Sequence, residues 1–87
     1  FSKTEKIVIQ NEDWHGAVAL GYAYASLPKS LNLLNKAVEL WQKAGKWARD
    51  KNDMYGIIET GRGFMSIGMS IEAEKYFDIA KKLLKKI

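Results

Sequence analysis

Apolar and polar positions alternate most regularly at the carboxyl end of the chain. Between Ile71 and Ile87 the apolar side chains recur every three or four residues, which is the spacing of one face of an α-helix. These side chains belong to Ala73, Tyr76, Phe77, Ala80, Leu83, Leu84 and Ile87. We expect Ser70 to cap the helix, because a serine hydroxyl can accept a hydrogen bond from a free N–H of the first turn. The pattern therefore predicts an amphipathic helix over residues 71–87.

A second apolar stripe predicts a longer helix from about Lys29 to Asp50. The stripe consists of Leu33, Leu34, Ala37, Leu40, Trp41, Ala44 and Ala48. Pro28 stands just before this helix, at a place where the missing N–H of proline costs nothing. Two further segments of helical length, residues 14–27 and 54–67, are rich in small residues. The chain is therefore predicted to be all-α, with antiparallel helix–turn–helix units.

Each of the two small-residue segments follows a short polar stretch that ends in an aspartate, Asp13 in one case and Asp53 in the other. An aspartate immediately before a helix is a favoured N-cap. A metal site would need more oxygen ligands than the local sequence offers. We therefore interpret both aspartates as helix caps.

The chain resembles itself after a shift of 40 residues, and the alignment needs no gap. The identical pairs include Lys3 and Lys43, Lys6 and Lys46, Asp13 and Asp53, Gly16 and Gly56, Gly21 and Gly61, Ser26 and Ser66, and Ser30 and Ser70. The same shift aligns residues 1–10, in which Ile7-Val8-Ile9 could suggest a strand, with the end of the long helix. We therefore predict one domain, in which a tail helix of a preceding unit (1–12) is followed by a first repeat (14–52) and a second repeat (54–87).

The second unit resembles the tetratricopeptide repeat, a helix–turn–helix motif with small and aromatic residues at fixed positions. Gly61 and Phe64 match the pattern of its first helix, and Ala73, Phe77 and Ala80 match that of its second. The resemblance implies a fragment of an α-solenoid, in which the first helix of each unit lines a groove that binds extended or helical peptides.

The first unit matches the same pattern at Gly21 and Tyr24 and then departs from it. Leu33 stands where a small residue is expected, Ala37 where an aromatic residue is expected, and Leu40 where alanine is expected. Because large-for-small and small-for-large exchanges compensate in volume, we interpret this unit as a variant of the same motif. The period of 40 residues exceeds the usual 34 of this family, and the extra residues lengthen the second helix.

Composition excludes several classes of function. The 87 residues are enough for one domain, and they contain no cysteine, which rules out disulfides, zinc–thiolate sites and thiol catalysis. The absence of cysteine fits a reducing compartment, so we expect a cytoplasmic location. His15 is the single histidine, and no serine or carboxylate stands beside it at a spacing typical of a catalytic group. We therefore expect neither catalysis, nor a metal site, nor a cofactor.

Charge and hydropathy argue against two kinds of partner. The net charge of +4 comes from lysines that mostly alternate with acids, whereas nucleic-acid binding requires a basic stripe. The longest stretch without a charge, residues 16–28, is shorter than the ~20 residues that span a bilayer. The basic carboxyl-terminal helix could lie on a membrane surface, but its apolar stripe is the one that the fold must bury. We therefore expect neither nucleic acid nor membrane as the partner.

The stretch from Gly61 to Gly68, GRGFMSIG, invites comparison with a phosphate-binding loop. Such a loop needs a preceding strand and a Lys-Ser or Lys-Thr after its last glycine, and neither is present. We interpret Gly61 and Gly63 as positions of close packing inside a helix, and Gly68 as the residue that ends it.

The resemblance implies that function resides on the groove formed by the first helices of the two units. The side chains expected to face a protein or peptide partner are His15, Val18, Tyr22, Ser26, Tyr55, Ile58, Arg62 and Met65. Their mixture of aromatic, aliphatic and methionine side chains with one arginine is typical of binding hot spots. The alternative is a self-assembly element that forms a homo-oligomer, because short repeat arrays expose apolar end faces.

Overall fold

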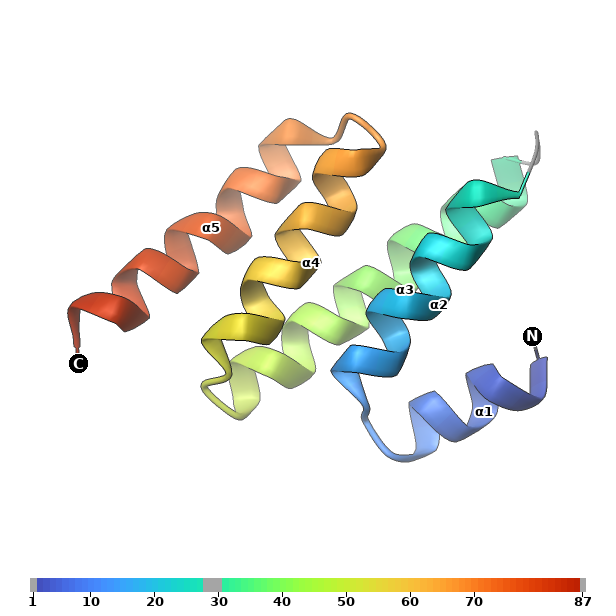
Figure 1. Ribbon diagram of the computed structural model, residues 1–87, viewed down its shortest axis with the longest axis horizontal. Helices are drawn as coiled ribbons and strands as arrows, with labels where there is room; N and C mark the ends of the chain where they lie inside the picture. Colours follow the sequence, from blue (N-terminus) through green and yellow to red (C-terminus); the bar gives the residue numbers. More distant parts are fainter. Residues whose placement is uncertain (1, 28–30, 87) are drawn as a thin grey trace.

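The computed structural model describes residues 2–27 and 31–86, with the side chains of residues 2, 31 and 32 left out of the description. It contains five helices, and the described residues include no strand (Figure 1). The helices are α1 (Ser2–Gln10), α2 (Trp14–Ser26), α3 (Leu31–Asp50), α4 (Met54–Ser66) and α5 (Ser70–Lys85). The predicted all-α fold is confirmed, and residues 7–9 are helical as expected.

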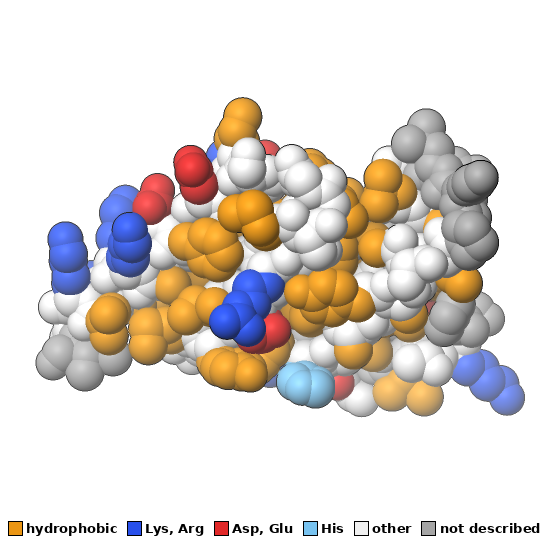
Figure 2. Space-filling model, turned by 45° about the horizontal axis from the view of Figure 1, so that its top comes forward, with side chains coloured by type: hydrophobic (Ala, Val, Ile, Leu, Met, Phe, Trp, Pro, Cys, Tyr) orange, Lys and Arg blue, Asp and Glu red, His pale blue; other side chains and the backbone are white. Residues whose placement is uncertain are grey.

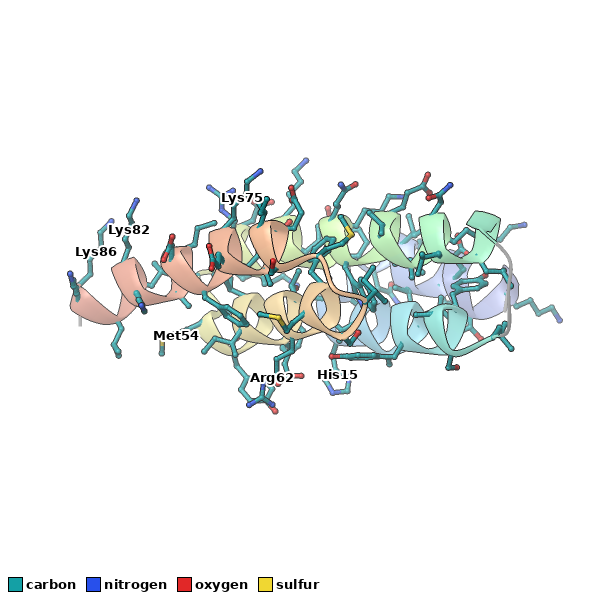
Figure 3. All side chains as sticks on the ribbon, turned by 90° about the horizontal axis from the view of Figure 1, so that it is seen from above. His15, Met54, Arg62, Lys75, Lys82 and Lys86 are labelled. Atoms are coloured by element: carbon teal, nitrogen blue, oxygen red, sulfur yellow. The ribbon has the colours of Figure 1, made fainter. Side chains whose placement is uncertain are left out.

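The helices form two antiparallel pairs, α2 with α3 and α4 with α5, which lie side by side (Figure 1). Viewed from above, α2 and α4 occupy one layer and α3 and α5 the other (Figure 3). Helix α1 packs against α2 at the amino end. This arrangement places the outer sides of α2 and α4 on the same side of the molecule.

The turn between α1 and α2 has the same backbone geometry as the turn between α3 and α4. Glu12 and Asn52, one in each turn, both have positive φ, at 49° and 53°. Asp13 and Asp53 follow with φ of −88° in both cases and ψ of 98° and 94°. Each of these two aspartates donates its backbone N–H to the residue five positions earlier. Residues 40 positions apart therefore adopt the same local conformation at these turns.

Trp41 lies at the centre of the core, where α2, α3 and α4 meet. Its side chain is fully buried, and its indole N–H donates to the backbone carbonyl of Val18 over 3.3 Å. Its ring meets that of Phe64 edge to face, with 5.6 Å between centroids. A Cβ atom added at Gly63 would lie 2.7 Å from the indole, and one at Gly21 would collide with the indole from α2. Because Gly21 and Gly63 have no side chain, α2 and α4 can both pack directly against the ring of Trp41.

Gly61 performs the same task between α4 and α5, since a Cβ atom there would lie 2.7 Å from the ring of Phe77. The predicted packing role of Gly61 and Gly63 is confirmed. Gly68 has φ of 82°, and its N–H donates to the carbonyl of Met65 over 3.0 Å, so it ends α4 as predicted. Among the described glycines, Gly68 is the one whose positive φ itself favours glycine.

Three local predictions need correction. Ser70 is the first residue of α5, and Met69 occupies the N-cap position without a side-chain hydrogen bond. Asp53 caps α4 as predicted. Asp13 has nearly the same backbone angles as Asp53, but its side chain makes no cap hydrogen bond. Helices α2 and α4 each end one residue before the predicted boundary. The predictions for residues 28–30 and for Ile87 lie outside the described residues.

No helix in the described part of the chain combines the length and the apolar character that crossing a bilayer would require.

Candidate binding surface

The candidate site is the outer side of α2 and α4, which we call the α2–α4 face. It comprises His15, Tyr22 and Ser26 from α2, and Tyr55, Glu59 and Arg62 from α4. His15 and Arg62 project from this side of the molecule, whereas Lys75, Lys82 and Lys86 project from the opposite side (Figure 3). The α2–α4 face is thus separated from the lysine-rich surface of α5.

An aromatic cluster joins the amino-terminal ends of the two helices. The ring of Trp14 lies 5.4 Å from that of His15 and 5.9 Å from that of Tyr55, measured between centroids. The indole N–H of Trp14 donates to the carboxylate of Asp53 over 2.8 Å, which ties the start of α2 to the start of α4. Tyr55 is 64% exposed, so its ring is supported by Trp14 on one side and open to a ligand on the other.

A polar cluster lies farther along the same face. Arg62 donates to the carboxylate of Glu59 over 3.4 Å, and the side chain of Arg62 is 67% exposed. Burial raises the pKa of Tyr22; the carboxylate of Glu59 raises it further, and the guanidinium of Arg62 opposes the rise. Tyr22 of α2 therefore lies within the electrostatic reach of both charges on α4.

The ring of Tyr22 rests on the core. It meets the ring of Trp41 edge to face, with 5.5 Å between centroids, while part of the side chain stays exposed. The fully buried Trp41 thus supports the ring of Tyr22 on one side. An aromatic side chain held in this way offers a ligand contact area at a small cost in side-chain entropy.

The structure brings together five of the eight residues predicted to face a partner. His15, Tyr22, Ser26, Tyr55 and Arg62 lie on the α2–α4 face, and Ser26 keeps its hydroxyl bonded to the carbonyl of Ala23 over 2.9 Å.

The remaining three residues have different surroundings. Val18 is 6% exposed and belongs to the hydrophobic core, so the prediction that it faces a partner is wrong. The reason is that Val18 packs into the core cluster that also contains Trp41 and Phe64. Ile58 lines a separate hollow beside α5, and Met65 is 47% exposed.

One residue of the α2–α4 face, Glu59, and one residue that supports it, Trp14, were not among the residues predicted from the sequence. Glu59 stands three residues before Arg62, a spacing that places both on one side of a helix, and this signal could have identified the ion pair. The role of Trp14 depends on its contacts with Asp53 and Tyr55, which lie far away in sequence. Within the described residues, no three His, Asp or Glu side chains are grouped in a way that could hold a metal ion.

Comparison of the chain with protein-family models, with curated proteins and with solved structures found no match in any of the three.

Proposed function

We propose that this chain is a tetratricopeptide-like array of helical hairpins that binds a protein or peptide segment on its α2–α4 face. The observation that carries the proposal is the pair of exposed aromatic side chains, Tyr22 and Tyr55, each supported by a tryptophan ring, on the face that also carries the charges of Glu59 and Arg62. Recurrence of the inter-helix turns after 40 residues supports the repeat character. The action is binding without catalysis or a cofactor.

The surface suggests the chemistry of the ligand. Tyr22 and Tyr55 favour aromatic or aliphatic side chains, which they can cover with partly exposed rings. The exposed guanidinium of Arg62 can form a two-pronged hydrogen bond with a carboxylate of the ligand. We therefore propose a ligand segment in which an acidic residue lies close to apolar ones.

The absence of cysteine from the chain supports a cytoplasmic location.

The test is selection of peptides displayed on phage against the immobilised chain, followed by affinity measurement. The double variant Tyr22→Ala and Arg62→Ala is expected to bind the selected peptides with an affinity that is lower by roughly tenfold or more, because both side chains belong to the types that dominate interface energies. A matched control replaces Lys75 and Lys82 by alanine on the opposite side of the molecule, where Figure 3 shows them. If the selected peptides bind the double variant as tightly as the original chain, the proposal fails.

The second candidate function is self-assembly, and exposed apolar side chains in the first and last helices favour it. Ile7 in α1 is 57% exposed and Leu84 in α5 is 59% exposed. Two such surfaces on one chain can pair head to tail between copies. Light scattering over a range of concentrations separates the candidates, since a constant monomer mass would exclude assembly.

A further inference from the structure

A second surface lies away from the α2–α4 face, in a hollow between α4 and α5. The hollow has a volume of about 250 Å³, and its lining is almost entirely apolar. It is lined by Met54, Ile58, Phe77, Ala80, Lys81 and Leu84. Figure 2 shows hydrophobic side chains gathered at the end of the molecule where α5 finishes, with Lys or Arg side chains beside them.

The first hairpin shows what covers the equivalent surface. Forty residues earlier, the same positions are occupied by Trp14, Val18, Ala37, Leu40, Trp41 and Ala44. All of these except Trp14 are buried. Helix α4 lies against this surface, with Tyr55 on the ring of Trp14 and Phe64 on the ring of Trp41. The molecule therefore contains its own example of a helix seated on this arrangement of residues.

In the second hairpin the same surface remains open. Ile58 is only partly buried, whereas its counterpart Val18 is 6% exposed. Leu84 is 59% exposed, whereas its counterpart Ala44 is fully buried. Exposed apolar side chains that line a hollow indicate a surface that gains free energy when another element covers it.

Charge distinguishes the open surface from its covered counterpart. Lys81 lines the hollow at the position that corresponds to Trp41, and Lys82, Lys85 and Lys86 follow it on the last turns of α5. In the described part of the chain, none of these four lysines takes part in an ion pair. The last acidic residue of the helix, Asp78, precedes all four. An element that covers the hollow therefore meets the unpaired positive charge of Lys81.

We propose that the hollow between α4 and α5 is a docking site for an amphipathic helix of a partner protein, with acidic residues beside its apolar stripe. The helical form follows from the way α4 covers the equivalent surface of the first hairpin. The acidic residues follow from Lys81, which replaces the buried tryptophan and needs a carboxylate opposite it. This site is distinct from the α2–α4 face and its ligand.

The test uses two synthetic helical peptides, each 16 residues long like α5. Both carry leucines three and four residues apart, and one has glutamates beside the leucines where the other has lysines. The chain is expected to bind the glutamate peptide in preference to the lysine peptide, measured by fluorescence anisotropy. Lys81→Glu is expected to lower the affinity for the glutamate peptide roughly two- to fivefold, the usual effect of one partly exposed charge pair. The same variant is expected to raise the affinity for the lysine peptide.

Two controls keep the result interpretable. Leu84→Ser, at an exposed position, is expected to lower the affinity for both peptides. Lys43→Glu on α3 is expected to leave the preference between the two peptides unchanged. Tyr22→Ala on the α2–α4 face is also expected to have no effect, which separates this site from the proposed function.

Three outcomes would overturn the proposal. The first is equal binding of the two peptides by the original chain, or no response to Lys81→Glu. The second is a mass that doubles without peptide and returns to that of a monomer in Leu84→Ser, because the occupant would then be a second copy. The third is tight binding of the chain to vesicles of anionic lipid that Leu84→Ser abolishes while neither peptide binds.

Discussion

Asp53 accepts the indole N–H of Trp14 with one carboxylate oxygen, at 2.8 Å, and the backbone N–H of Gly56 with the other, at 3.1 Å. One side chain thus caps α4 and holds it against the start of α2. Its counterpart in the first turn, Asp13, has the same backbone angles and no such bonds. The two aspartates therefore form a natural pair for measuring what these hydrogen bonds contribute.

Asp53→Ala is expected to lower the free energy of unfolding by about 1–3 kcal/mol, because it removes a cap and leaves the indole N–H without its partner. Asp13→Ala is expected to lower it by less than about 0.5 kcal/mol, as at an ordinary surface position. Urea denaturation followed by tryptophan fluorescence measures both. Equal losses in the two variants would mean that the bonds of Asp53 do not stabilise the fold.

Gly63→Ala is expected to destabilise the chain by about 1–3 kcal/mol, because the new methyl group would lie 2.7 Å from the fully buried Trp41. In an exposed helix the same exchange would stabilise by up to about 1 kcal/mol. The sign of the change therefore tests the packing directly. Thermal unfolding of the variant and of Met65→Ala, a 47% exposed position on the same helix, provides the comparison, and a stabilised Gly63→Ala would contradict the packing.

The raised pKa of Tyr24 predicts that the folded chain becomes less stable at alkaline pH. Its hydroxyl donates to Glu5 over 2.7 Å, and this bond, aided by burial, raises the pKa of Tyr24 from 10.0 to about 12. The folded chain therefore holds a proton that the unfolded chain releases, and the resulting stability is complete below pH 10 and is lost as pH rises towards 12.

Tyrosinate absorbance during an alkaline titration measures this group. Tyr24→Phe is expected to remove one tyrosine that titrates near pH 12, and Glu5→Gln is expected to move that titration to lower pH. A titration curve that keeps its most alkaline component in Tyr24→Phe would contradict the assignment.

Arg62→Ala is expected to change the free energy of unfolding by less than about 0.5 kcal/mol, because its ion pair with Glu59 is exposed. This small effect matters for binding experiments, since a loss of affinity in the variant can then be assigned to the missing contact. Chemical denaturation of the single variant checks the expectation. A loss well above this value would show that Arg62 supports the fold.

Local patterns were sufficient to predict the helices. The apolar spacing of α5 and the positions of Asp53 and Gly68 depend on residues close in sequence, so boundaries at these points were predicted to within one or two residues. The 40-residue alignment also assigned residues 7–9 to a helix, against their intrinsic preference for a strand. Tertiary packing overrides that preference here, because Val8 is buried in the core.

The binding surface was predicted less well, because exposure depends on the neighbouring helix. Val18 and Ile58 occupy equivalent positions in the two units, yet Val18 is buried in the core and Ile58 lines the hollow between α4 and α5. Nothing within either helix distinguishes them. The influence of Glu59 and Arg62 on the pKa of Tyr22 likewise links two helices, and it depends on the packing of α2 against α4.

The glycines of α4 have a consequence for the order of folding. Gly56, Gly61 and Gly63 fall within 13 residues, and each lowers helix propensity by about 1 kcal/mol relative to alanine. Such a segment does not form a stable helix alone, because short helices are marginal even when every residue favours them. Helix α5, which contains no glycine, can form early, and α4 then becomes helical only as it docks on Trp41 and Phe77. Helix α4 is thus expected to become helical only on docking, and it is the helix that joins the two halves of the molecule.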